Sequence, residues 1–284
     1  MNNFLVCLDG SKLDEHIIRY SSMMAHLVAC KKVIFIHAVK VNLDTSLKKQ
    51  FKELISQKFD YSCETSIEII RGSNASEILA WPHMKEIDLI VMGIKPKSDS
   101  TGVHAAKIMG GSYCSVLLVP TTALAEISSV LIPLDFSDNS VRALKVAKAI
   151  QKEKDLTVYL QHVFYVPTGY SATGKTYEEF AEIMQKNKRK EYSKFKQQHE
   201  IDDSTFEVIF TLDNDDKPSD NIYEMAEEKK VSMIVLGSTG KTKAASMLLR
   251  STAIGLLKYD EDIPCLVVKN KEENIGFFQA LLRV

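Results

Sequence analysis

Short apolar runs rich in β-branched residues alternate along the chain with longer amphipathic stretches. In the first half, runs of this kind predict strands near 3–8, 33–39, 64–70, 88–92 and 115–119. Hydrophobic positions at helical spacing predict helices near 12–30, 44–58, 74–86 and 101–111. Because the strands are apolar on both faces and alternate with helices, the pattern indicates a parallel sheet covered on both sides.

The second half of the chain shows the same alternation. Its strands are predicted near 129–134, 156–164, 205–211, 231–236 and 264–268. Its helices are predicted near 138–153, 176–199, 218–229 and 244–258. The two halves therefore have the same order of elements, with five strands in each.

Four segments of the first half recur in the same order in the second. The sequence FLVCLDGS at 4–11 matches VLIPLDFS at 130–137, which places Asp9 and Asp135 126 residues apart. The other matches pair the strands that end in His37 and His162, then IDLIVMG with VSMIVLG, then SVLLV with PCLVV. Such self-similarity indicates two copies of one domain. We expect domains at 1–122 and 129–270, followed by an apolar tail at 271–284 that docks on the core or on a second subunit.

Composition and charge exclude several classes of protein. The chain has 284 residues, of which 45% are hydrophobic, and 36 basic side chains oppose 37 acidic ones. No apolar run is long enough for a membrane helix, and a nucleic-acid binder would normally carry a strong basic excess. Five cysteines, without a C-x-x-C pair, do not fit a disulfide framework and favour a reducing compartment. We therefore expect a cytoplasmic protein that binds neither membranes nor nucleic acids.

The loops that follow the strands carry the candidate chemistry. In an open parallel sheet, ligands bind beyond the carboxyl ends of the strands, where the strand order reverses. In the second repeat, Asp135 follows the first strand, Val163 lies near the end of the second, and Gly237 ends the fourth. The sequence GSTGKTKAASMLLRST at 237–252 supplies glycines and hydroxyls before a helix, which predicts a phosphate cradle. A plain strand-to-helix turn that needs two glycines explains the same pattern.

These features resemble the universal stress protein family over essentially the whole chain. Nucleotide-binding members of that family show G-x-x-G, nine residues, and then G-[ST]; here Gly237 and Gly240 are followed by nine residues, Arg250 and Ser251. The resemblance implies two tandem Rossmann-like domains of the adenine nucleotide alpha hydrolase type. Each would have a five-stranded parallel sheet with helices on both faces.

The resemblance also implies a site for ATP, with Mg²⁺, in the second repeat. Asp135 would face the adenosine end and Val163 would line the base, while the glycine loop and the hydroxyls after Arg250 would hold the phosphates. Arg250 stands where the family has glycine, and it either blocks close approach to a phosphate or supplies a guanidinium; we expect blockade. The implied cofactor-binding residues are Leu134, Asp135, Val163, Gly237, Gly240, Arg250, Ser251 and Thr252.

The first repeat departs from the motif. Pro96 stands at the place of the second glycine and has no N–H to donate. The loop from Gly93 to Gly102 is four residues shorter than that from Gly237 to Arg250. We expect this degenerate loop to leave the first repeat with a structural or partner-binding role.

A second nucleotide-binding motif competes with this interpretation. The sequence GYSATGKT at 169–176 matches the Walker A pattern G-x-x-x-x-G-K-[ST]. However, the preceding strand is predicted to end near Phe164, which leaves four residues between it and the first glycine, whereas a P-loop follows its strand directly. We expect a flexible glycine-rich connection here, with an ATPase that uses Lys175 as an alternative.

The resemblance implies a stress-response regulatory protein, and we expect no catalytic residues or metal ligands. No residue is placed to activate a water, and His37 and His162 are expected to pack or form hydrogen bonds. A nucleotide-free scaffold or protein-interaction module is the main alternative.

The last strands of the repeats, 115–119 and 264–268, are apolar edges that need covering, so we expect the repeats to pair within one chain. A homodimer and an adenine nucleotide are the other expected partners.

Overall fold

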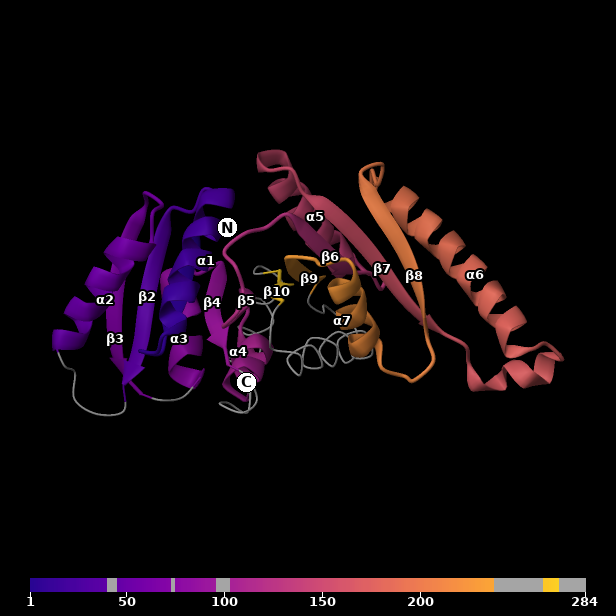
Figure 1. Ribbon diagram of the computed structural model, residues 1–284, viewed down its shortest axis with the longest axis horizontal. Coiled ribbons are helices and arrows are strands. Elements are labelled where there is room, and N and C mark those ends of the chain that lie inside the picture. The colour runs from indigo at the N-terminus through magenta and orange to yellow at the C-terminus, as the bar shows by residue number, and fades with distance from the viewer. Residues whose placement is uncertain (40–44, 73–74, 96–102, 238–262, 271–284) are drawn as a thin grey trace, which may run out of the picture. The chain divides into compact units, whose positions relative to one another are not determined.

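The computed structural model describes residues 1–39, 45–72, 75–95, 103–237 and 263–270 (Figure 1). They belong to two compact units. The first unit comprises Met1–Ile127 and, from the segment that begins at Leu257, the described residues 263–270. The second unit comprises Ser128–Leu256.

The first unit is built on five parallel strands in the order β3-β2-β1-β4-β5. The strands are β1 (Asn3–Leu8), β2 (Lys32–Val39), β3 (Glu64–Arg71), β4 (Leu89–Ile94) and β5 (Ser115–Pro120). β1 pairs with both β2 and β4, so the strand order reverses at β1. Every residue of β5 is buried, which explains why its sequence is apolar without alternation.

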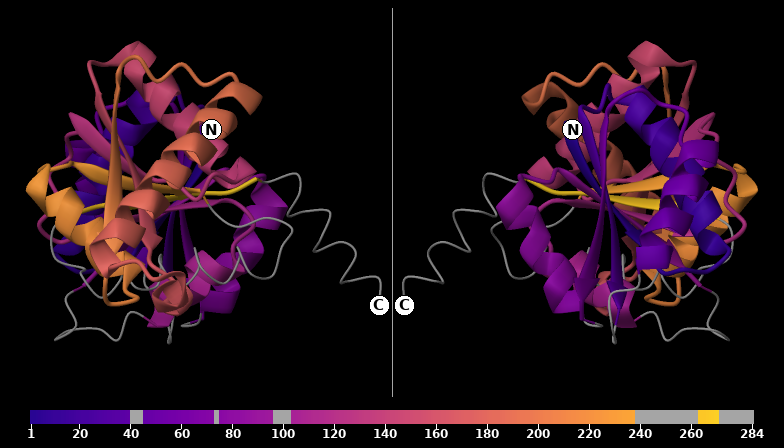
Figure 2. Two further views of the ribbon diagram at one scale, coloured as in Figure 1. Left: turned by 90° about the vertical axis from the view of Figure 1, so that its right-hand side faces the viewer. Right: turned by 90° about the vertical axis from the view of Figure 1, so that its left-hand side faces the viewer.

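Helices cover both faces of this sheet (Figure 2, right). They are α1 (Leu13–Leu27), α2 (Thr45–Lys58), α3 (Ala75–Lys85) and α4 (Val103–Gly111). Right-handed crossovers place α1 and α2 on one face and α3 and α4 on the other. In agreement with this, α1 packs against α2, and α3 packs against α4.

A sixth strand, β10 (Cys265–Val268), pairs antiparallel with β5. The backbone N–H of Lys269 donates to Ser115 Oγ at 3.1 Å. Its Nζ donates to the carbonyl oxygens of Met109 and Ser112, at 2.5 and 2.6 Å, where α4 ends. The run at 264–268 is thus a strand, as predicted, and it covers the apolar edge formed by β5.

The described residues of the second unit form four parallel strands in the order β9-β6-β7-β8. The strands are β6 (Ser129–Pro133), β7 (Thr157–Tyr165), β8 (Phe206–Asp213) and β9 (Met233–Gly237). This order repeats that of β4-β1-β2-β3 in the first unit. The predicted α/β fold with parallel sheets and helices around them is therefore confirmed.

The helices of the second unit follow the same winding. They are α5 (Asp138–Glu153), α6 (Tyr177–Gln198) and α7 (Pro218–Glu228). α5 contacts β6 and β9, whereas α6 contacts β7 and β8 and runs beside β8 (Figure 1). The helix predicted near 244–258 lies outside the described residues. None of the helices in the described ranges is long and apolar enough to cross a membrane.

Candidate functional site

The two units build the same frame at the carboxyl end of their first strand. His37 Nδ1 donates to the carbonyl of Leu8 at 2.9 Å, and His162 Nδ1 donates to that of Leu134 at 2.7 Å. Because a carbonyl oxygen only accepts, Nδ1 carries the proton in both rings. Each bond ties the first strand of its repeat to the second, beside the point where the strand order reverses. Both histidines therefore form hydrogen bonds, as the sequence predicts.

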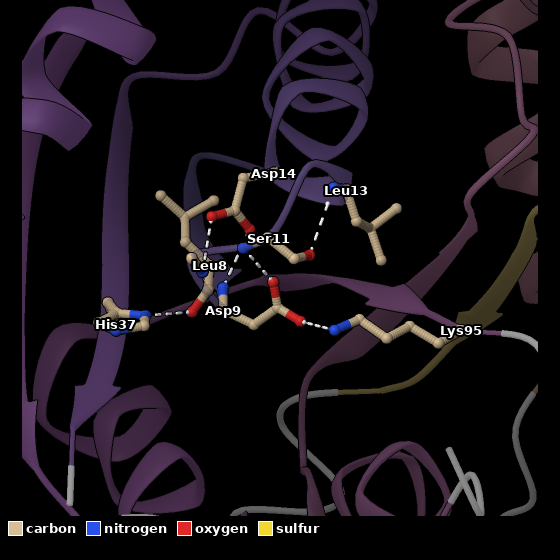
Figure 3. A network of polar contacts seen from close by, with 8 residues as sticks. Leu8, Asp9, Ser11, Leu13, Asp14, His37 and Lys95 are labelled. Atoms are coloured by element: carbon tan, nitrogen blue, oxygen red, sulfur yellow. Dashed lines mark hydrogen bonds and ion pairs between the residues drawn. The ribbon is translucent and has the colours of Figure 1, made fainter. Parts of the chain in front are cut away.

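In the first unit, α1 closes the loop that follows β1 (Figure 3). The carboxylate of Asp14 accepts the backbone N–H groups of Asp9 and Gly10 at 2.9 and 2.8 Å. Asp9 Oδ1 in turn accepts the N–H of Ser11 at 2.9 Å. Gly10 has a φ of +81°, a conformation that glycine adopts without strain. The amides of this loop are therefore already occupied by carboxylates of the unit itself.

Asp14 is a buried carboxyl group, with 1% of its surface exposed. Burial raises its pKa to about 6, although the hydrogen bonds from Asp9 and Gly10 act in the opposite direction. The second repeat has Ser140 at the matching position, five residues after its own aspartate. A neutral hydroxyl thus replaces a titratable group at the same place in the frame.

An ion pair lies across the crevice of the first unit (Figure 3). Lys95 follows β4, and its Nζ lies 2.6 Å from Asp9 Oδ2. Burial alone would raise the pKa of Asp9, but the hydrogen bonds from Lys95 and Ser11 outweigh it and hold that pKa below its usual range. The aspartate at this crevice therefore already has a counter-ion from the same unit.

In the second unit, serines hold the matching aspartate instead. Asp135 Oδ1 accepts the N–H and the hydroxyl of Ser137, at 3.0 and 2.5 Å, and the hydroxyl of Ser140 at 2.7 Å. The N–H of Asp135 donates to Ser140 Oγ at 3.1 Å. Within the part of the chain that the structure describes, Asp135 Oδ2 accepts no hydrogen bond. This oxygen can therefore accept one from a ligand.

Three of the other predicted site residues lie around this aspartate. Leu134 is buried, and both of its backbone groups are used, by Gln161 and His162. Val163 is partly exposed near the end of the neighbouring β7. β9 pairs with β6 so that Leu131 faces Ile234, which brings Gly237 level with Leu134. The other four predicted residues, Gly240, Arg250, Ser251 and Thr252, lie outside the described residues.

Gly237 is required by packing between β9 and α5. A Cβ at this position would lie 2.1 Å from the carbonyl oxygen of Asn139 and 3.0 Å from the nitrogen of Ser140. Both atoms belong to the backbone in the first turn of α5, so no rotamer change can make room. Sequence reasoning predicts this glycine from a ligand's need for close approach, whereas the structure gives it a role in joining strand and helix.

An aromatic cluster beside the crevice escaped sequence reasoning. Phe136 stacks on His162, with ring centroids 4.2 Å apart, and also contacts Tyr192 and Phe195 of α6. Phe136 has a φ of +61°, which is rare for a bulky residue, where the first repeat has Gly10. Burial lowers the pKa of His162, and its Nε2 is buried with no partner among the described residues. The only signal in the sequence is the change from DGS to DFS.

The Walker A match forms local structure rather than a phosphate loop. Residues Thr168–Thr173 form a 3₁₀ helix, η1, and the N–H of Gly174 donates to Ser171. The Thr176 hydroxyl accepts the N–H of Glu179 at 3.2 Å and caps α6. In a P-loop, the amides surround phosphates and this hydroxyl binds Mg²⁺. The expected flexible connection is thus a 3₁₀ turn with a capped helix, and this geometry does not favour the ATPase alternative.

No group of three or more His, Cys, Asp or Glu side chains within the described ranges could hold a metal ion. The described groups at the crevice of the second unit are one carboxylate, two serine hydroxyls and a buried imidazole, whose pKa is lowered by burial.

Sequence relatives match about half of the chain. The model of the universal stress protein family matches residues 126–269, which is just over half of the chain. Universal stress protein MJ0531 of Methanocaldococcus jannaschii is 35% identical over 146 residues, covering 51% of this chain and 83% of the relative. Universal stress protein MJ0577 of the same organism is 34% identical over 158 residues, covering 50% of this chain and 94% of the relative.

Solved structures resemble the whole chain. A universal stress protein from Archaeoglobus fulgidus matches with a TM-score of 0.62 and 17% identity, covering 95% of this chain and 96% of its own. A functionally unknown protein of Pseudomonas aeruginosa PAO1, PA1789, matches with a TM-score of 0.70 and 14% identity, covering 100% and 98%. At these identities the likeness concerns the fold alone. Together with the family match and the curated relatives, the shared fold confirms the resemblance seen in the motifs, and the chain belongs to the universal stress protein family.

Proposed function

We propose that this protein is a cytoplasmic stress-response regulator that binds an adenine nucleotide, ATP with Mg²⁺, in the crevice of its second unit. The observation that carries the proposal is the difference between the two crevices. Asp9 is paired with Lys95, whereas Asp135 Oδ2 has no hydrogen-bond donor among the described residues. The second crevice therefore offers an acceptor that a ribose hydroxyl or an adenine amino group can use.

The described residues fit a nucleoside at this position. Three hydrogen bonds to Oδ1 fix the orientation of the Asp135 carboxylate before any ligand arrives. α5 begins three residues later, and the positive end of a helix favours nearby negative charge. Gly240, Ser251 and Thr252 would take the phosphates, as the family motif implies, and Mg²⁺ would neutralise part of the phosphate charge.

The same residues favour a regulatory role over a catalytic one. His162 is the one imidazole described beside this crevice, and its Nδ1 is used by Leu134 while its ring lies against Phe136. Asp135 is engaged by two serines through Oδ1. Asp135 Oδ2 is thus the acceptor left for the nucleotide, and these contacts support its binding and release.

Titration calorimetry and thermal unfolding with Mg-ATP test the proposal. We expect one site per chain and a higher Tm, because a ligand at 100 times its Kd stabilises the native state by about 2.7 kcal/mol. Asp135→Asn should weaken binding at least tenfold, since the amide can present a donor where the carboxylate presents an acceptor. Asp9→Asn, in the other crevice, is the matched control and should leave binding unchanged.

Three results would contradict the proposal. Two equal sites per chain, or binding that is insensitive to Asp135→Asn, would place the nucleotide elsewhere. No heat of binding and no change of Tm with either ATP or AMP would favour the nucleotide-free scaffold. Turnover of ATP that is lost in Lys175→Ala would instead support the ATPase.

A further inference from the structure

We propose that a groove beside α1 and the end of α2, in the first unit, is a separate binding site for a small aromatic carboxylate with a hydrogen-bond donor on its ring. The groove encloses about 380 Å³, within the roughly 300–1,000 Å³ typical of small-molecule sites. The side chains that would recognise the ligand are Arg19, Ser22, His26, Lys58, Asp60 and Tyr61.

Two cations, Arg19 and Lys58, line the groove. Arg19 donates to Glu15 Oε1 through Nε and Nη2, at 3.3 and 3.2 Å, and Lys58 Nζ donates to the same oxygen at 2.7 Å. Two positive charges thus share one negative charge, and one oxygen receives three donors. A guanidinium has five N–H donors and an ammonium has three, so most of these donors remain for a second anion. A carboxylate on the ligand would supply it, because a planar guanidinium matches a carboxylate in shape.

Two rings, those of His26 and Tyr61, also line the groove. His26, in the last turn of α1, and Tyr61, in the loop after α2, have ring centroids 5.8 Å apart at an angle of 51°. His26 is exposed and Tyr61 is partly exposed, so both rings have surface to offer. Aromatic side chains favour tilted or offset contacts with another ring. An aromatic ring on the ligand therefore packs better against these two rings than an aliphatic chain of equal size.

Asp60 completes the groove. The Ser22 hydroxyl donates to Asp60 Oδ1 at 2.5 Å, and the backbone N–H of Asp60 donates back to Ser22 Oγ at 3.0 Å. Ser22 is 2% exposed, so this reciprocal pair anchors the loop to α1 in the absence of any ligand. An ionised carboxylate can only accept hydrogen bonds, so a ligand group beside Asp60 must donate. A ring that carries a carboxylate and an amino or hydroxyl group can offer the carboxylate to Arg19 and Lys58 and the donor to Asp60.

The groove belongs to the first unit alone and is distant from its crevice. α1 starts at the carboxyl ends of the strands and finishes at their amino ends, where His26 lies and where Tyr61 precedes β3. The crevice with Asp9 is at the opposite edge of the sheet. At the 126-residue offset, lysines stand in place of Arg19, Ser22 and His26 in the second repeat. The site is therefore independent of the nucleotide site proposed above.

A fluorescent probe, 2-aminobenzoate, tests the proposal on the full chain. We expect saturable binding of one molecule per chain. Arg19→Gln and Lys58→Gln should each weaken binding at least tenfold, and Arg19→Lys, which keeps the charge, should recover part of the loss. Lys52→Gln, an exposed lysine on the same helix α2, is the matched control and should bind like the wild type. Circular dichroism of each variant verifies that it is folded.

Two further ligands separate the contributions of the ring substituents. Benzoate lacks the donor that faces Asp60, and aniline lacks the carboxylate, so each should bind at least tenfold more weakly than 2-aminobenzoate. Equal binding of benzoate, no saturation by 2-aminobenzoate, or unchanged binding in the Arg19→Gln/Lys58→Gln double variant would overturn the proposal. Displacement of the probe by Mg-ATP would also overturn it. The double variant should still bind Mg-ATP like the wild type, so failure here is distinguishable from failure of the nucleotide proposal.

Discussion

The close approach of β9 to α5 makes Gly237→Ala a sharp test of packing in the second unit. The added Cβ would lie 2.1 and 2.4 Å from the carbonyl oxygen and carbon of Asn139, and 3.0 Å from the nitrogen of Ser140. Non-bonded carbon contacts are favourable at about 3.5–4.0 Å. Since all three neighbours are backbone atoms, the strand and the helix must separate by roughly 1 Å, and the contacts around them are lost together.

The first unit provides the matched control at the equivalent position. A Cβ at Gly93 would lie 2.4 Å from Leu13 Cδ2 and 2.8 Å from Ile17 Cδ1, which are the ends of flexible side chains. These atoms can turn aside, so the overlap can be relieved within one layer of side chains. Overpacking of a core costs about 1–3 kcal/mol and occasionally more. We expect about 1 kcal/mol for Gly93→Ala and at least about 3 kcal/mol for Gly237→Ala.

Urea unfolding followed by far-UV circular dichroism measures both costs in the same chain. The unfolding midpoint should fall more for Gly237→Ala than for Gly93→Ala at an unchanged slope, because the slope reports the surface exposed on unfolding. A Gly237→Ala variant within about 1 kcal/mol of the wild type, or one no less stable than Gly93→Ala, would refute the packing argument. The need for glycine would then have to come from the loop that follows it.

Three other perturbations follow from single contacts. Asp14→Ser should gain stability relative to the wild type as the pH rises from 4 to 7, by about 2 kcal/mol, because the pKa of Asp14 is about 6 in the native state against 3.8 in the unfolded chain, and the stabilisation by its protonated form is lost as the pH rises through 6; a pH-independent difference in urea stability would contradict this. Lys269→Met should cost about 1–2 kcal/mol of unfolding free energy, because it removes a cation from the carbonyls of Met109 and Ser112 at the end of α4; an unchanged midpoint would show that these bonds contribute nothing. Arg250→Gly should tighten ATP binding at least tenfold, about 1.4 kcal/mol, by restoring the family's glycine; weaker binding in calorimetry would make Arg250 a phosphate ligand.

The period of the hydrophobic pattern predicts the first and last residues of the described helices and strands to within a few positions. The strand expected at 33–39 is β2 (Lys32–Val39), and the helix expected at 218–229 is α7 (Pro218–Glu228). The pattern says less about how a strand pairs with its neighbour. The apolar runs 115–119 and 264–268 predict two edges that need covering, but the pattern does not predict the antiparallel orientation in which β5 and β10 pair.

Prediction from sequence is limited in the same way at the candidate site. The motif Asp-x-Ser locates both crevices, because it ties an aspartate to the end of a strand and to the start of a helix. It does not reveal what neutralises that aspartate, since Lys95 follows Asp9 by 86 residues. A glycine in a sequence is equally consistent with a turn, a bound phosphate or a tightly packed helix, and only the distance from Gly237 to Asn139 identifies the packing role.

The two crevices differ in the groups that hold their loop amides and aspartates. In the first, Asp9 and Asp14 place two carboxylates on the loop amides and one lysine opposes them. In the second, Ser140 replaces the second carboxylate and accepts the corresponding amide as a neutral hydroxyl. Two carboxylates and one ammonium carry the same net charge as the single carboxylate described in the second crevice, so net charge does not separate the two. The shared histidine bonds keep the backbone frame the same in both repeats. Because the aspartate of the first crevice already has a charged partner, we expect the second crevice to be the one that takes a ligand.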